Sequence, residues 1–193
     1  MKKPAETAVA INEILTHRWS PRSFDAQHEV SKEDVTALLE AARWAPSSNN
    51  GQPWRFIVAR RGSENFSALI KIMAGFNQMW TPAASLLIAI VAKMTNEDGT
   101  PRSVSLYDSG IASGLLTVEA MHRGLAVHQI GGFEKSAFVE SFALDKEHEP
   151  VIILAIGKQA PAEKLEHEAL QQREVAPRER KPLEELVISG LNE

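Results

Sequence analysis

The sequence predicts a domain of mixed helices and strands, in which helices cover both faces of a central sheet. Residues 54–59 are rich in β-forming side chains, and residues 84–91 and 151–156 are almost continuously apolar. Strands that are apolar on both faces must be covered on both sides, and segments with helical spacing of apolar residues separate them along the chain. These segments therefore supply the two covering layers.

Each predicted helix has a start or an end signal in the sequence. Residues 5–15 carry apolar side chains at loose helical spacing and stop before Pro21. Ser31 is the candidate N-cap of a helix that ends before Pro46. Further helices are predicted at residues 63–75, 105–123 and 134–142, and glycine closes the first two. A fourth, short strand is predicted at residues 126–130.

Composition narrows the function classes. The net charge of −4 over 193 residues gives no positive field that would attract nucleic acid or anionic lipid, so we expect neither as a partner. The absence of cysteine excludes disulfides, thiolate metal sites and a cysteine nucleophile. The longest apolar run is about half of the ~20 residues that a membrane span needs. We expect no membrane span, no signal peptide and a cytoplasmic location.

The chain is predicted to consist of a core, residues 1–159, and a C-terminal arm, residues 160–193. The arm is rich in Glu, Gln, Arg and Pro, and its few large apolar residues gather near its end. Such a segment buries too little apolar surface to fold alone. We therefore expect it to wrap the body or a partner subunit.

Arg18, Ser20 and Arg22 form the first candidate site. Ser20 precedes a proline and is pushed to extended geometry, in which alternate side chains share a face. Two guanidinium groups and a hydroxyl on one face suit a phosphate monoester. The same residues are also typical of a solvated basic turn, and the spacing alone favours that interpretation.

Three further segments are candidates, each with a plain structural alternative. Residues 46–54 place serine, asparagine and glutamine before a strand, as polar ligand sites do, but connecting loops share this composition. Gly131 and Gly132 end a strand and permit close approach of a flat ligand, although a tight turn is the commoner explanation. The basic residues at 178–181 are typical of a solvated surface.

Several mechanisms lack their motif. The glycines form neither a dinucleotide-binding nor a phosphate-loop pattern, and Ser113 stands one place too late for a hydrolase nucleophile. The six histidines show no metal-ligand spacing, so we expect no metal site.

Taken in order, these segments resemble the FMN-dependent nitroreductase family. The match begins with Arg18-x-Ser20-x-Arg22 and continues through the Pro-Ser-Ser-Asn-Asn-Gly-Gln-Pro-Trp stretch at residues 46–54, which is its most specific element. It extends through Asn77, the helix at residues 108–124, the glycine pair and the strand end at residues 156–157, and so covers nearly the whole chain.

The resemblance implies an α+β fold with a central, mainly antiparallel sheet, and a homodimer in which the C-terminal arm is exchanged. Two tightly bound FMN molecules would lie at the subunit interface, and no side chain need be catalytic because flavin N5 carries the chemistry. The implied FMN contacts are Arg18, Trp19, Ser20, Arg22, Arg178 and Arg180 on the phosphate side, Pro46, Ser47, Ser48, Asn50 and Gln52 in the loop of the other subunit, Asn77 at the pyrimidine edge, and Gly131 and Gly132 beside N5.

The resemblance also implies an NAD(P)H-dependent oxidoreductase that reduces nitroaromatics, quinones or a related small-molecule electron acceptor in ping-pong order. The alternatives are a flavin-dependent enoyl reductase or dehalogenase of the same fold, and an FMN-binding module without turnover. The chain departs from the family at Trp80, where many relatives carry lysine, and at Gly131, which replaces an acidic residue. The connection at residues 93–104 is short, so we expect a more open or partner-completed pocket.

Overall fold

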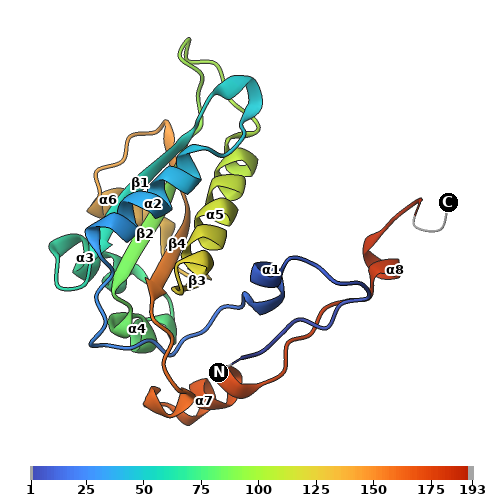
Figure 1. Ribbon diagram of the computed structural model, residues 1–193. Helices are drawn as coiled ribbons and strands as arrows, with labels where there is room; N and C mark the ends of the chain where they lie inside the picture. Colours follow the sequence, from blue (N-terminus) through green and yellow to red (C-terminus); the bar gives the residue numbers. More distant parts are fainter. Residues whose placement is uncertain (1, 191–193) are drawn as a thin grey trace.

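Four antiparallel strands form the centre of the protein. The computed structural model describes residues 2–190, so the end of the predicted arm, residues 191–193, lies outside the description. The strands follow the order β1-β2-β4-β3 in one sheet, and every neighbouring pair is antiparallel (Figure 1). They are β1 (Trp54–Arg60), β2 (Leu86–Lys93), β3 (Ala126–Ile130) and β4 (His148–Gly157). The α+β class and the antiparallel sheet are thus confirmed.

Helices cover both faces of this sheet, as predicted. One layer contains α2 (Lys32–Arg43) and α5 (Ser105–His122), and the other contains α3 (Glu64–Ile72) and α6 (Lys135–Ser141). Strand β2 serves both cores, because Leu86, Ile88 and Ile90 pack on the first layer while Leu87, Ala89 and Val91 pack on the second. This alternation is the period of two that a strand imposes. Within residues 2–190, no helix is long and apolar enough to cross a membrane.

Two helix predictions need correction. The helix expected at residues 5–15 is confined to α1 (Glu13–His17), and residues 2–12 before it form no helix or strand. The apolar side chains of Val9 and Ile11 are exposed, so little burial stabilises a helix there. The helix expected to close at Gly75 ends at Ile72, because Met73 leaves it to form a bridge with Phe133.

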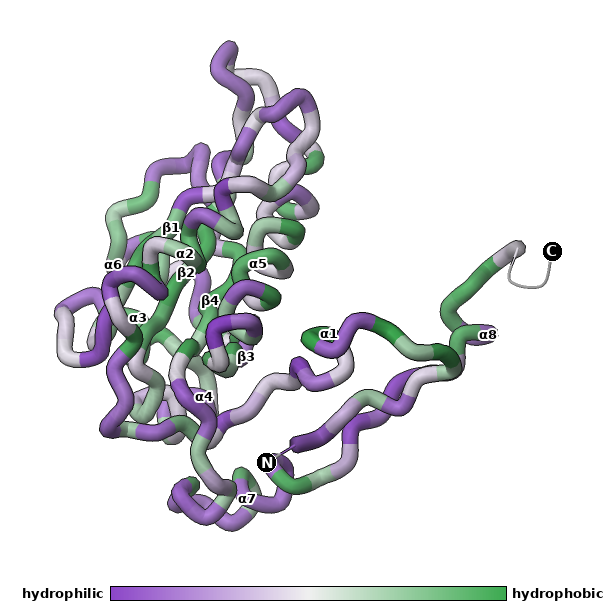
Figure 2. The backbone as a smooth tube through the Cα atoms, viewed as in Figure 1, coloured by the Kyte–Doolittle hydropathy of each residue, from purple (hydrophilic) through white to green (hydrophobic). Residues whose placement is uncertain are grey.

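The two ends of the chain leave the body together as a projecting arm (Figure 1). The C-terminal part contains α7 (Glu168–Val175) and α8 (Leu183–Leu186), which the sequence did not predict. Arg178 Nη1 donates hydrogen bonds to the carbonyl oxygens of Lys3 and Thr16 at 2.7 and 2.8 Å, and so ties the two segments together. Figure 2 shows apolar stretches along this arm. They include the exposed residues Val9, Ile11, Leu15, Val175, Leu183, Leu186 and Ile188.

Candidate functional site

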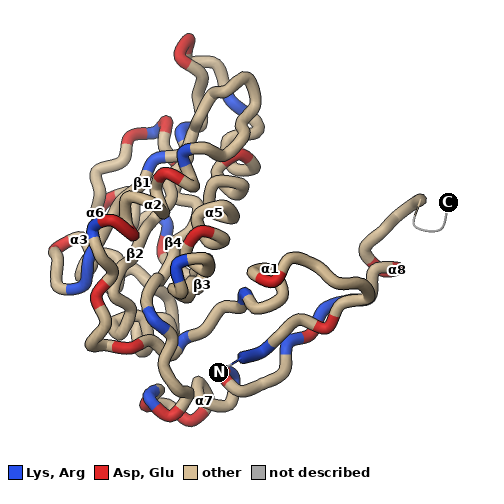
Figure 3. Tube along the Cα trace, in the orientation of Figure 1, with Lys and Arg blue, Asp and Glu red and all other residues tan. Residues whose placement is uncertain are grey.

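Three guanidinium groups, those of Arg18, Arg178 and Arg180, lie close enough together for their charges to interact. Arg18 Nη1 lies 3.5 Å from Ser20 Oγ, so these two side chains share a face. Burial, followed by the positive charges of Arg178 and Arg180, lowers the pKa of Arg18. Among residues 2–190, no carboxylate forms an ion pair with any of the three. Figure 3 shows Lys and Arg of both terminal segments along this arm.

This cluster fits an anion better than it fits a solvated turn. Like charges held close together repel one another, and a bound phosphate would turn that repulsion into charge-assisted hydrogen bonding. The ligand interpretation of the Arg18 segment stays a prediction, with which this clustering of charge is consistent. The residues present fit the phosphate group of FMN.

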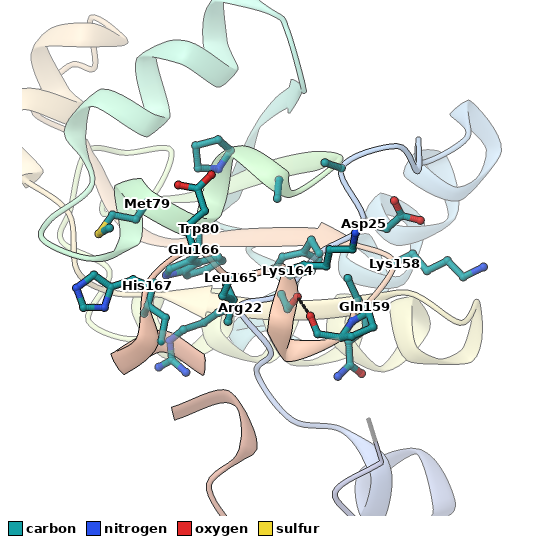
Figure 4. Close-up of a pocket in the computed structure, with 18 of the residues that line it drawn as sticks. Arg22, Asp25, Met79, Trp80, Lys158, Gln159, Lys164, Leu165, Glu166 and His167 are labelled. Carbon is teal, nitrogen blue, oxygen red and sulfur yellow. Dashed lines mark hydrogen bonds between the residues drawn. The ribbon is translucent and has the colours of Figure 1, made fainter. Parts of the chain in front are cut away.

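Arg22 is fixed in place by a hydrogen bond of its backbone, which leaves its side chain available to bind a ligand. The N–H groups of Arg22 and Ser23 donate to the carboxylate of Glu174 at 2.9 and 3.2 Å, and Glu174 is only 1% exposed. Burial lowers the pKa of the Arg22 guanidinium, while the Glu174 charge raises it. That guanidinium donates no hydrogen bond to the described part of the chain. It lines a cavity of about 640 Å³ together with Phe24, Trp80 and His167 (Figure 4).

Trp80, at the end of α4 (Asn77–Trp80), fills the core beside this segment. It is 2% exposed, stacks with Phe24 at a centroid distance of 6.1 Å, and lies 4.6 Å from the ring of His128. The indole therefore supplies an apolar wall and no positive charge.

His128 is a residue that sequence reasoning set aside. Its Nδ1 lies 2.9 Å from the carbonyl oxygen of Pro21, between Ser20 and Arg22. Burial lowers the pKa of His128 to about 4, so the ring is neutral at pH 7 and Nδ1–H donates to this carbonyl. The contact joins β3 to the Arg18–Arg22 segment across 107 residues of sequence, and no local pattern could have revealed it.

Asn77 and Gly132 form a second group of predicted site residues. Asn77 Nδ2 donates to the carbonyl oxygen of Gly132 at 3.3 Å, and a Cβ atom at Gly132 would stand only 3.0 Å from that nitrogen. Neither Gly131 nor Gly132 has a positive φ, so turn geometry does not require glycine at either position. Both are exposed, which leaves the backbone open to a ligand at the end of β3.

The remaining predicted residues lie elsewhere in the chain. Pro46, Ser47, Ser48, Asn50 and Gln52 belong to the loop that enters β1 at Trp54, at the opposite end of the sheet from the Arg18 segment (Figure 1). One chain therefore does not bring the two groups together. Trp19 is buried beneath Lys3, whose Nζ lies 4.1 Å from the ring centroid, so its contact with a cofactor stays a prediction.

Known proteins are similar to this chain in sequence and in fold. A sequence model of the nitroreductase family matches residues 15–76 and 64–158. YdgI of Bacillus subtilis, named as an NAD(P)H nitroreductase, is 34% identical over 77% of this chain and 88% of that protein. A crystal structure of an oxidoreductase containing FMN is 30% identical with a TM-score of 0.89, and the match covers 97% of this chain and 96% of that one.

A second structure extends the comparison. An FMN complex from Exiguobacterium sibiricum, assigned as a nitroreductase, is 28% identical with a TM-score of 0.75 and covers 96% of this chain and 99% of that one. The family match spans most of the chain, and the fold is shared along nearly its whole length. The chain therefore belongs to the nitroreductase family.

Proposed function

We propose that this chain binds FMN tightly and uses NAD(P)H to reduce a small-molecule electron acceptor such as a nitroaromatic compound or a quinone. The observation that carries the proposal is the cluster of Arg18, Arg178 and Arg180, whose charges no carboxylate among residues 2–190 pairs. It occurs in a chain that has a relative named as an NAD(P)H nitroreductase and a fold similar to that of structures that contain FMN. When bound, FMN supplies hydride transfer at its N5 atom.

In this proposal the side chains of the protein bind FMN and orient it. Arg18 and Ser20 would hold the phosphate, with Arg22 beside them at the cavity edge. The Asn77 amide has both donor and acceptor atoms, which suits a pyrimidine edge that presents both. His128 commits its Nδ1 proton to Pro21, so we assign it to holding the segment rather than to proton transfer.

We infer that a second copy of the chain completes the site, giving a homodimer with two FMN sites. The loop at residues 46–52 lies far from Arg18 in its own chain, so it would serve the partner's cofactor. Exposed apolar residues occur both on the projecting arm and on the body, where Trp44 and Tyr107 are 74% and 71% exposed. Surfaces of this kind favour association, and the arm at residues 160–193 would lie on the partner.

A flavin-binding module without turnover is the second candidate. Trp80 favours it, because an apolar side chain in the core offers no positive charge to stabilise a reduced ring. An enoyl reductase or dehalogenase of the same fold would be distinguished from a nitroreductase by the acceptor that reoxidises the flavin.

Purification and kinetics separate these candidates. We expect a yellow dimer with one FMN per chain, measured by light scattering on a sizing column and by acid extraction of flavin. NADH or NADPH should bleach the flavin, and one member of a panel of nitroaromatic, quinone, enoyl and haloaromatic acceptors should restore its colour. Since we assign no separate nicotinamide site, steady-state plots should give the parallel lines of ping-pong order. A colourless monomer contradicts the proposal, a flavin that neither nicotinamide bleaches supports the binding module, and intersecting lines contradict the kinetic order.

A further inference from the structure

A buried ion pair lies beside the loop at residues 46–52. Arg102 Nη2 is 3.1 Å from Asp108 Oδ2, and the two side chains are 10% and 3% exposed. Arg102 belongs to the short connection after β2, and Asp108 to the first turn of α5. Removing two charges from water is costly, and further hydrogen bonds to the two groups offset part of that cost.

Further hydrogen bonds from this pair go to the two peptide groups on either side of the Ser48 Cα atom. The Asp108 carboxylate accepts from the N–H of Ser48 at 3.2 Å, and Arg102 Nη2 donates to the carbonyl oxygen of the same residue. The Arg102 guanidinium also lies against Gly51 and leaves no room there for a side chain. The negative Asp108 thus binds the N–H of Ser48 and the positive Arg102 binds its carbonyl oxygen. Together they fix the direction of the chain on either side of Ser48.

The loop has an unusual backbone that such support would stabilise. Asn49, Asn50 and Gln52 have φ angles of 50°, 53° and 44°, a region that asparagine tolerates better than most residues and that glutamine rarely adopts. Within the loop, Ser47 Oγ accepts from the N–H of Gln52 at 3.1 Å. This local hydrogen bond closes the loop on itself, and within residues 2–190 the hydrogen bonds that tie Ser48 to the body come from the Arg102–Asp108 pair.

We propose that Arg102 and Asp108 are positioning residues that hold residues 47–52 in the conformation required to contact FMN. The inference rests on the proposed function, since it takes this loop as part of the cofactor site. Arg102 and Asp108 act through Ser48 and themselves touch no reacting atom. The pair therefore controls how long FMN stays bound and the environment of its ring.

The test uses full-length holoprotein and four variants. Arg102→Met removes the guanidinium group, Arg102→Lys keeps the positive charge but loses the paired N–H donors, and Asp108→Asn removes the negative charge. Arg123→Met is the matched control, because Arg123 pairs with Asp34 and Glu119 on the surface at the far end of α5. Release of FMN is followed by recovery of flavin fluorescence on dilution, and hydrogen exchange is measured for the peptide that contains Ser48.

Arg102→Met and Asp108→Asn should release FMN at least tenfold faster, shift the visible spectrum of the bound flavin, and speed exchange of the Ser48 amide. Arg102→Lys should show each of these changes to a smaller extent. If the other two variants fail to fold, the comparison of Arg102→Lys with wild type tests the proposal. A purely structural pair would lower the melting temperature but leave the release rate and spectrum at the values of the wild type and Arg123→Met, and that result overturns this inference alone. A wild-type chain that takes up no FMN overturns the proposed function as well.

Discussion

Replacing Arg22 with alanine tests whether the cationic segment binds the cofactor. The guanidinium lines the cavity of about 640 Å³ and donates no hydrogen bond to the described part of the chain, so the substitution breaks no internal bond. A hydrogen bond to a charged group contributes about 1.5–3 kcal/mol. Since 1.4 kcal/mol is about tenfold in affinity, Arg22→Ala should weaken FMN binding by roughly tenfold to a hundredfold.

The same substitution should leave the fold intact. The backbone N–H of residue 22 still donates to Glu174, and the attraction of the Arg22 charge to Glu174 is lost together with its repulsion from Arg173. We expect the free energy of unfolding to change by about 1 kcal/mol or less. The assay is an equilibrium titration of the apoprotein with FMN, paired with a thermal melt of each protein.

Arg43→Ala is the matched control for this experiment. Arg43 is exposed on α2 and pairs only with Glu40, so its loss changes the net charge equally without touching the site. The control should retain wild-type affinity. Equal affinities for Arg22→Ala and Arg43→Ala would refute the reasoning and show that residues 18–22 are only a basic turn.

Two further predictions concern stability. The pKa of His128 is about 4 in the folded chain and ~6.5 when unfolded, so only the unfolded chain takes up this proton between those values. The free energy of unfolding should fall as pH falls through this window, by up to about 3 kcal/mol, and urea titrations of His128→Gln should lose that slope. Glu174→Ala leaves the N–H groups of Arg22 and Ser23 without their acceptor and should destabilise the protein by about 2–5 kcal/mol, whereas the exposed Glu179→Ala should change it by less than about 0.5 kcal/mol in the same melts.

The sheet was predictable because its signal is local. An apolar run such as residues 84–91 can be satisfied only by burial on both faces, and β2 indeed contributes alternate residues to both cores. The helix expected at residues 5–15 was wrong for a related reason. Helical spacing of apolar residues predicts a helix only where those residues are buried against the rest of the protein. Val9 and Ile11 are exposed in the single chain, so their spacing was misleading.

The candidate site also contains some residues that local sequence predicts and others that it does not. Arg18 and Ser20 could be paired from sequence, since extended geometry alone places alternate side chains on one face. Glu174, His128 and Arg102 could not, because each is a single polar residue that gains its role from a backbone group far away in the chain.

The glycine pair shows how structure decides between two interpretations of one motif. Two glycines after a strand usually mark a tight turn, but such a turn needs glycine only where φ is positive. Neither Gly131 nor Gly132 has one, so their backbone would accept other residues on conformational grounds. A side chain at Gly132 would crowd the Asn77 amide, whose nitrogen lies 3.0 Å from the position of its Cβ and would have to shift, whereas a Cβ at Gly131 would meet only Ile152 at 3.9 Å. Glycine at 132 is therefore favoured by close approach to another predicted site residue, and the sequence could not show this because α4 comes from 55 residues earlier in the chain.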